Sequence, residues 1–495
     1  MKTQITKRAL TLALCLLLLP LWGMAQVHGP VYEVFVASFR DGDGDRVGDL
    51  KGLKQKLDYI QSLGARSLWL MPISPSPSYH KYDVTDYMAI DPAYGTLADF
   101  EALAAESDAR GISLILDLVL NHASSQHPWF LEAARSLSNG THSPYIGYFH
   151  FSQSVGHPVP GAPGWYYQGN FGPHMPDLNL DNQALREDIV GILTFWLNKG
   201  ADGFRLDATT HYYEDHVANN TAFLAWLHQE VKKIKPAAYL VAEAWKDENT
   251  ILSLYESGID SLFNFPMSGA TGWLIPAMRA GQGAQIANRV AAWQQKIRQR
   301  NPQALDAPFL SNHDMGRSAG YLMLKPQQIK LAAALYLTMP GLPYIYYGEE
   351  LGMSGSGRDE NKRLPMLWAA DESQNTLPPA EADQQQRLKQ GVDAQEQDAA
   401  SVLRFYQHLG TLRALCPELE RGRVEAVDLG HNSLAAWRVT MDDTSVLVIH
   451  HLGKEPLSIP LPQGAMIGSW DTGLGLPEAA GDQLILAPQS GCIFR

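Results

Sequence analysis

The sequence predicts an α/β protein built on a (β/α)8 (TIM) barrel, with a small domain inserted after the third strand and an antiparallel β-sandwich at the C-terminus. Strand-like and helix-like segments alternate eight times along most of the chain. The strand-like segments are short, continuous apolar runs, which are typical of parallel strands buried on both faces. A doubly wound open sheet is the alternative, but eight units and an insertion after the third strand favour a closed barrel.

The first half of the alternation ends in a long irregular segment. Its expected elements are strand 31–39, helix 50–63, strand 67–71, helix 97–109 and strand 113–119. Residues 122–176 then contain many Gly, Pro, His and aromatic residues without a sustained period. This segment is too long for an ordinary loop, so it predicts a small inserted domain.

The second half of the alternation leads into a different pattern. Its expected elements are helix 184–198, strand 203–207, helix 221–234, strands 239–242 and 261–265, helix 285–298, strand 308–310, helix 326–337 and strand 344–347. A polar loop, 371–399, precedes the last barrel helix, 400–415. Short alternating strands such as 434–439 and 445–450 follow. The predicted division is therefore barrel 26–121 and 177–416, inserted domain 122–176 and all-β domain 417–495.

The N-terminus has the pattern of an exported protein. Lys2, Lys7 and Arg8 precede an apolar stretch, 9–22, that is too short to span a bilayer comfortably. Small residues before and at Ala25 predict cleavage there, so residues 1–25 form a signal peptide and the protein is secreted or periplasmic. We expect no membrane span in the mature chain and a monomer.

Charge and cysteine content narrow the function further. The formal net charge of -13 disfavours nucleic acids and anionic membranes as partners, and leaves neutral substrates unaffected. Cys416 and Cys492 remain after cleavage. A disulfide and a pair of buried free thiols fit them equally well.

Charged residues close four of the predicted barrel strands. They are Asp117 with Asn121 and His122, then Arg205 with Asp207, then Glu243, and finally Asn312, His313 and Asp314. Because the carboxyl ends of barrel strands meet at one face, we expect these side chains in one pocket. One such strand end could be a structural ion pair, but three carboxylates together indicate chemistry. Two carboxylates flanking a bond are what glycosidic cleavage needs.

These segments resemble the four short motifs of the α-amylase superfamily (glycoside hydrolase family 13). Segments 117–122, 203–211, the neighbourhood of Glu243 and 309–314 occur in the order of that family, and 175–179 resembles its additional motif. Segments 82–87, 341–343 and 363–366 also fit. The chain looks most like bacterial secreted α-amylases, with features similar to oligo-1,6-glucosidases and neopullulanases.

The resemblance implies roles for individual residues. Asp207 would be the nucleophile, Glu243 the general acid and base, and Asp314 the residue that holds the sugar hydroxyls. The substrate-binding residues would be Tyr82, Asp83, His122, Arg205 and His313. Arg205 should also orient Asp207 and lower its pKa, because an adjacent cation favours the carboxylate.

A run of alternating aspartates after the first strand predicts a Ca²⁺ site. Carboxylates separated by Gly surround hard cations, but Arg46 and Gly52 stand where an EF-hand needs Gly and Glu. The resemblance implies the ligands Asp41, Asp43, Asp45, the carbonyl of Val47, and Asp49. The alternative is a solvated acidic turn. A second site would use Asn121, Asp177 and the carbonyl of His211.

The resemblance implies a secreted, retaining hydrolase of internal α-1,4 bonds in α-glucans or maltooligosaccharides. The nearest alternatives are an α-glucosidase and a 4-α-glucanotransferase. A non-catalytic amylase-like binding protein is the alternative of another class, but such proteins have lost the carboxylates that are present here. Ala208 stands where relatives specific for α-1,6 bonds tend to carry Val, and Thr210 replaces the usual Lys. We therefore expect α-1,4 cleavage with weak acceptor binding.

Overall fold

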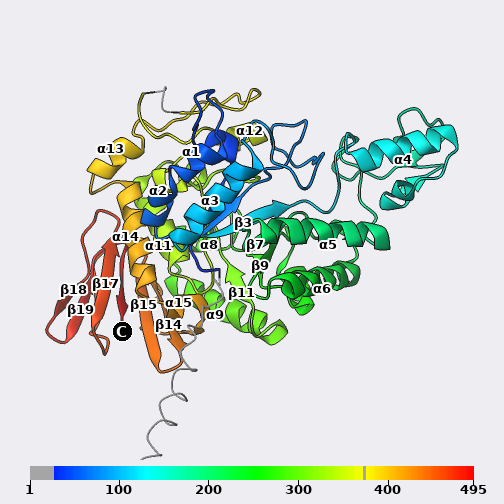
Figure 1. Ribbon diagram of the computed structural model, residues 1–495. Helices are drawn as coiled ribbons and strands as arrows, with labels where there is room; N and C mark the ends of the chain where they lie inside the picture. Colours follow the sequence, from blue (N-terminus) through cyan, green and yellow to red (C-terminus); the bar gives the residue numbers. More distant parts are fainter. Residues whose placement is uncertain (1–26, 372–374) are drawn as a thin grey trace, which may run out of the picture.

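The computed structural model describes residues 27–371 and 375–495, and the predicted signal peptide lies outside these ranges. Figure 1 shows the barrel in the middle of the molecule. Helix α4 (Pro128–Asn139), from the inserted segment, and the C-terminal sheets lie at opposite ends of this view. Within the described ranges, no helix is both long and apolar enough to cross a membrane.

Eight parallel strands form the barrel, which confirms the predicted fold. They are β1 (Val31–Val34), β2 (Ser67–Leu70), β3 (Ser113–Leu118), β7 (Gly203–Leu206), β9 (Tyr239–Ala242), β10 (Ser261–Phe263), β11 (Leu305–Ala307) and β12 (Tyr344–Tyr346). Their order in the sheet is β11-β10-β9-β7-β3-β2-β1-β12. A parallel bridge between Phe309 and Tyr344 joins the two edges. This closure excludes the doubly wound open sheet.

Helices cover the outside of the barrel strands (Figure 1). The longer ones are α3 (Leu97–Ala109), α5 (Gln183–Asn198), α6 (Val217–Ile234), α9 (Gly283–Arg300), α11 (Pro326–Leu337) and α14 (Val402–Ala414). Helices α3 and α11 have the predicted bounds. The side chains of Thr96 and Asp99 form a reciprocal capping box at the start of α3, which is a local signal.

Helix 50–63 was expected as one element but is two, α1 (Leu50–Lys54) and α2 (Leu57–Ser62). At the break, Lys56 lies over the Trp368 ring, 4.1 Å from its centroid. That contact comes from a distant part of the chain. The loop predicted at 371–399 also contains a short helix, α13 (Val392–Gln397).

Two strand predictions were wrong in extent or position. The first strand ends at Val34, and the 3-10 turn η1 (Val36–Ser38) follows it. The seventh strand is β11, not 308–310, because Pro308 has no N–H to donate to a sheet. The true strand was missed because Asp306, a charged residue, interrupts its apolar pattern. Its carboxylate accepts hydrogen bonds from distant residues, including Trp293 Nε1 at 3.0 Å.

The inserted segment has its own small sheet of β4 (Phe151–Ser152), β6 (Tyr166–Tyr167) and β5 (His157–Pro158). Helix α4 was not predicted, although His127 caps its start, Pro128 occupies its first turn and Gly140 ends it in the left-handed conformation. The buried residues Phe130, Ala133 and Ala134 also have helical spacing, so the sequence carried the signal for this helix.

The C-terminal region is the predicted antiparallel sandwich. One sheet contains β13 (Arg423–Ala426), β14 (Leu434–Met441), β15 (Thr444–His451), β20 (Ser490–Phe494) and β17 (Met466–Asp471). The other contains β16 (Leu457–Pro460), β19 (Gln483–Leu486) and β18 (Glu478–Ala480). An apolar cluster from both sheets, including Leu434, Ile459 and Leu484, forms its core.

Both cysteines of the described chain are buried free thiols, which decides between the two alternatives. Cys492 lies on β20 in the sandwich core, whereas Cys416 belongs to the main core of the barrel. Burial raises the pKa of Cys416 to about 11 and that of Cys492 to about 12. Such thiols are chemically inert near neutral pH.

Candidate active site

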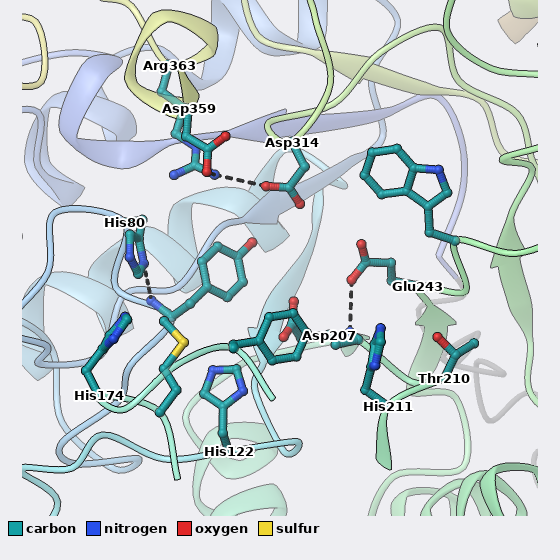
Figure 2. Close-up of a pocket in the computed structure, with 15 residues that line it drawn as sticks. His80, His122, His174, Asp207, Thr210, His211, Glu243, Asp314, Asp359 and Arg363 are labelled. Carbon is teal, nitrogen blue, oxygen red and sulfur yellow. Dashed lines mark hydrogen bonds and ion pairs between the residues drawn. The ribbon is translucent and has the colours of Figure 1, made fainter. Parts of the chain in front are cut away.

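A cavity of about 430 Å³ opens at the carboxyl ends of the barrel strands. Asp207, Glu243 and Asp314 all line it, and Figure 2 shows these three carboxylates around one space. The other lining residues are His80, Tyr82, His122, Phe171, His174, Met175, Ala208, Thr210, His211, Trp245, Asp359 and Arg363. The structure therefore brings the three predicted catalytic residues together.

One buried guanidinium joins the acidic groups. Arg205 Nη1 lies 2.7 Å from Asp207 Oδ1 and 2.8 Å from Asp117 Oδ1, and Nη2 lies 2.8 Å from Glu243 Oε2. Asp117 had been noted only as a strand end, yet its fully buried carboxylate shares the cation and also accepts from Tyr82 Oη at 3.1 Å. It could have been found from its position one residue before the end of β3, on the same side of the sheet as Arg205.

Burial raises the pKa of the two central carboxyl groups, Asp207 and Glu243. It raises the pKa of Asp207 to about 6, against the opposing attraction of Arg205. Arg205 thus acts in the predicted direction, but desolvation is larger. Burial also raises the pKa of Glu243 above its ordinary value, again with Arg205 opposing. A raised pKa is what a general acid needs in order to carry its proton near neutral pH.

Asp314 has the opposite electrostatic setting. Burial alone would raise its pKa, but His313 and Arg363 outweigh burial and hold the pKa well below its usual range. His313 Nε2 lies 2.9 Å from Asp314 Oδ2, and Arg363 Nη2 lies 2.9 Å from Asp314 Oδ1. Asp314 is therefore an ionised acceptor at the edge of the cavity, suited to sugar hydroxyls.

The turn after β7 holds Glu243 through its backbone. Ala208 has φ +47°, a left-handed conformation that is uncommon for a residue with a Cβ. In this conformation its N–H donates to Glu243 Oε2 at 2.9 Å. Backbone strain of this kind persists only where the surrounding structure determines it. The nucleophile and the acid are thus linked both by Arg205 and by the backbone.

Of the predicted substrate-binding residues, Tyr82 and His122 line the cavity. Nε2 of His122 is buried and has no hydrogen-bond partner among the described residues. Burial lowers the pKa of His122 to about 4, so the ring is neutral. This unpartnered nitrogen is itself buried, so a sugar hydroxyl would reach it only after a neighbouring side chain had moved.

Asp83, Arg205 and His313 lie behind the cavity wall instead. Asp83 accepts hydrogen bonds from Ser76 and Ser78. His313 stacks on Tyr82, with ring centroids 5.5 Å apart and an interplanar angle of 13°. Arg205 and His313 contact the lining residues Asp207 and Tyr82. Asp83 contacts two serines that do not line the cavity.

Two aromatic residues at the cavity were not singled out from the sequence. The Trp245 side chain is 53% exposed and stacks on Phe265, with centroids 5.1 Å apart. Phe171 is 44% exposed, and its ring meets that of His211 at 5.2 Å. Exposed flat rings beside a cavity suit the faces of sugars. The position of Trp245, two residues after Glu243, was the available signal.

Three of the four predicted aspartate ligands lie close enough together to bind one hard cation. Ligand oxygens of Asp41, Asp43 and Asp49 lie within 4.8 Å of one another. Asp45 is not in this group, and its Oδ1 accepts the Val47 N–H at 2.7 Å. Asp49 also caps α1 by accepting from Gly52 N at 2.7 Å. Three carboxylates at this spacing are the oxygen donors that Ca²⁺ prefers.

The second predicted metal site is arranged differently. Asn121 and Asp177 are adjacent, but the Asn121 amide nitrogen donates to Asp177 Oδ1 at 3.2 Å. The carbonyl of His211 accepts from Glu214 N at 3.2 Å. Each of these three groups has a hydrogen-bond partner within the protein, and this second metal site stays a prediction.

A closed barrel with a buried nucleophile candidate, a carboxylic acid of raised pKa and an ionised third carboxylate defines a glycoside hydrolase of the two-carboxylate class. Comparisons agree. A family model for the alpha amylase catalytic domain matches residues 33–422. The chain therefore belongs to the alpha-amylase family.

Individual relatives cover nearly the whole chain. Alpha-amylase 3 of Dictyoglomus thermophilum is 40% identical over 431 residues, which are 86% of this chain and 84% of that protein. The structure of Eubacterium rectale Amy13B superposes with a TM-score of 0.90 at 38% identity and covers 95% of each chain. The alpha-amylase from H. orenii has a TM-score of 0.84 at 34% identity and covers 94% of this chain and 99% of its own.

Proposed function

We propose that this protein is an exported, retaining α-amylase that hydrolyses internal α-1,4 bonds of starch-like α-glucans. The observation that carries the proposal is the sharing of Arg205 by Asp207 and Glu243 in a cavity that Asp314 also lines. Export, with removal of residues 1–25, rests on the N-terminal pattern alone.

The geometry supports a double displacement. Arg205 binds Oδ1 of Asp207 and leaves Oδ2 to attack the anomeric carbon. Glu243 donates its proton to the departing glycosidic oxygen, and its carboxylate then removes a proton from the attacking water. Asp314 accepts hydrogen bonds from hydroxyls of the distorted sugar. Two inversions at the anomeric carbon return the α configuration.

Ala208 and Thr210 bear on which bond is cut. Both line the cavity, and the small Ala208 side chain leaves room for the acceptor sugar of an α-1,4 chain. Thr210 offers no charged donor to that sugar. One steric change of this size supports discrimination of about 1–3 kcal/mol.

We expect kcat/KM to be about tenfold or more higher on maltopentaose than on isomaltotriose. Separating the products over time in the same samples shows whether the enzyme cuts internal bonds, releases glucose or transfers glucan chains. Equal or better turnover of isomaltotriose would contradict the interpretation of Ala208. Glucose as the sole early product from starch would favour an α-glucosidase, and chain lengthening of maltotriose would favour a glucanotransferase.

We also propose that Asp41, Asp43 and Asp49 bind Ca²⁺. When bound, the cation would neutralise carboxylates that otherwise repel one another, and it would tie the loop after β1 to α1. The protein alone supplies the catalytic groups, which lie in a separate cavity.

A chelator should lower the melting temperature, and added Ca²⁺ should restore it, because the ion binds the native state. Asp43→Asn is expected to abolish this response. Asp45→Asn is the matched control, since it removes a neighbouring carboxylate that lies outside the group, and it should keep the response. A Ca²⁺ response that survives Asp43→Asn would rule out this site.

A further inference from the structure

A carboxylate lies inside the barrel where the proposed mechanism does not use one. Glu33 is in the middle of β1 and only 1% exposed. Its Oε1 lies 2.6 Å from His313 Nδ1 and 3.4 Å from the backbone N of His313. A buried carboxylate on a barrel strand is costly unless a partner compensates its charge. The His313 ring is the partner given by this geometry.

The other nitrogen of the same ring faces the cavity side. His313 Nε2 lies 2.9 Å from Asp314 Oδ2 and 2.6 Å from Tyr82 Oη. Tyr82 Oη itself donates to Asp117 Oδ2, so toward the ring it acts as an acceptor. Nδ1 therefore faces a carboxylate oxygen, and Nε2 lies between the Tyr82 hydroxyl oxygen and the Asp314 carboxylate. Acceptors at both nitrogens favour the imidazolium, the form with two N–H groups. A neutral ring would turn a lone pair toward one of the carboxylates.

The charges around the ring agree with this protonation state. Burial alone would lower the pKa of His313, but Asp314 and Glu33 outweigh burial and raise it to about 9. The other titratable groups near the ring are Tyr82, Asp117 and Arg205, and Arg363 contacts Asp314 from the opposite side.

We propose that Glu33 is a positioning residue of the reaction, which holds His313 as an imidazolium so that its Nε2–H orients Oδ2 of Asp314 in the cavity. Glu33 itself does not line the cavity. The inference rests on the proposed function for the role of Asp314. It adds a residue on the first barrel strand to a site whose catalytic carboxylates come from the fourth, fifth and seventh strand regions.

Glu33→Gln tests the charge while keeping the shape and an acceptor oxygen. Without the charge the pKa of His313 falls, so the ring should lose its proton as the pH rises. The ratio of kcat/KM between variant and wild type should stay within about threefold at pH 5 and fall by about tenfold or more by pH 8. This ratio cancels the titration of Glu243, which both proteins share. A ratio that is low but constant with pH would overturn the inference.

Glu350→Gln is the matched control. Glu350 is equally buried and accepts from the hydroxyls of Tyr32 and Tyr59 at 2.7 and 2.6 Å, but it does not line the cavity. Its kcat/KM ratio should be constant with pH. A pH-dependent ratio in this variant equal to that of Glu33→Gln would assign the effect to general destabilisation and overturn the inference.

A second measurement does not depend on how well Glu33→Gln folds. In wild-type protein labelled with ¹⁵N-histidine, the His313 signals can be assigned by their loss in His313→Asn. Both ring nitrogens should remain protonated through pH 8. A neutral ring at pH 7 would overturn the inference alone, whereas wild-type protein inactive on every α-glucan would refute the proposed function.

Discussion

Asp207→Asn is expected to lower kcat by at least ~10³-fold while the fold survives, because the amide cannot form the glycosyl-enzyme. Glu243→Gln should lose as much, because it has no proton to donate and cannot act as a base. Hydrolysis of maltopentaose measures the activity, and circular dichroism with the melting temperature measures the fold.

Asp306→Asn is the matched control for these variants. Asp306 is also a buried barrel carboxyl, 3% exposed, but it does not line the cavity. Burial raises its pKa to about 7, so the native group is already partly neutral at neutral pH. Its kcat should stay within about threefold of wild type. An Asp207→Asn variant with activity equal to this control would contradict the assignment of Asp207.

The configuration of the first product tests the same assignment independently. Two displacements at the anomeric carbon release the α-anomer. Proton NMR during the first minutes of hydrolysis, before mutarotation, shows which anomer appears. A β-anomer appearing first would mean that water attacks directly and that Asp207 is not a nucleophile.

The second large effect is expected at Arg205. Arg205→Leu leaves Asp117, Asp207 and Glu243 buried together without their cation. Removing one partner of a buried ion pair typically costs about 3–5 kcal/mol of unfolding free energy. Urea denaturation of the variant and the wild type at pH 7 measures this loss.

The loss of unfolding free energy in Arg205→Leu should depend on pH. Burial already raises the pKa of Asp207 to about 6, and without Arg205 the carboxyl pKa values should rise further. A group whose pKa is raised in the folded state stabilises the fold at low pH and stops doing so as the pH rises through that pKa. The destabilisation should therefore be smaller at pH 5 than at pH 8.

Arg205→Lys is the control for that experiment, because it keeps the charge without the planar fork that reaches three carboxylates. It should lose less stability than Arg205→Leu. Equal losses at pH 5 and pH 8 for Arg205→Leu would show that packing, and not charge, is the contribution of Arg205.

Much of the fold could be predicted from local patterns. The buried parallel strands are short apolar runs, and the start of α3 follows from the Thr96 and Asp99 capping box. Because strand alternation and the direction of barrel strands are local rules, they also predicted that Asp207, Glu243 and Asp314 would meet. These are properties of neighbouring residues, which a sequence shows directly.

Interactions between distant residues decided the rest. The seventh strand was misplaced because the groups that satisfy Asp306 come from elsewhere in the chain. The pKa of Asp207 rises because many elements together exclude water, although its nearest cation is two residues away. Glu33 was not singled out from the sequence, since its partner, His313, is 280 residues further along the chain. Burial and long-range pairing depend on closure of the barrel, so only the tertiary structure could show them.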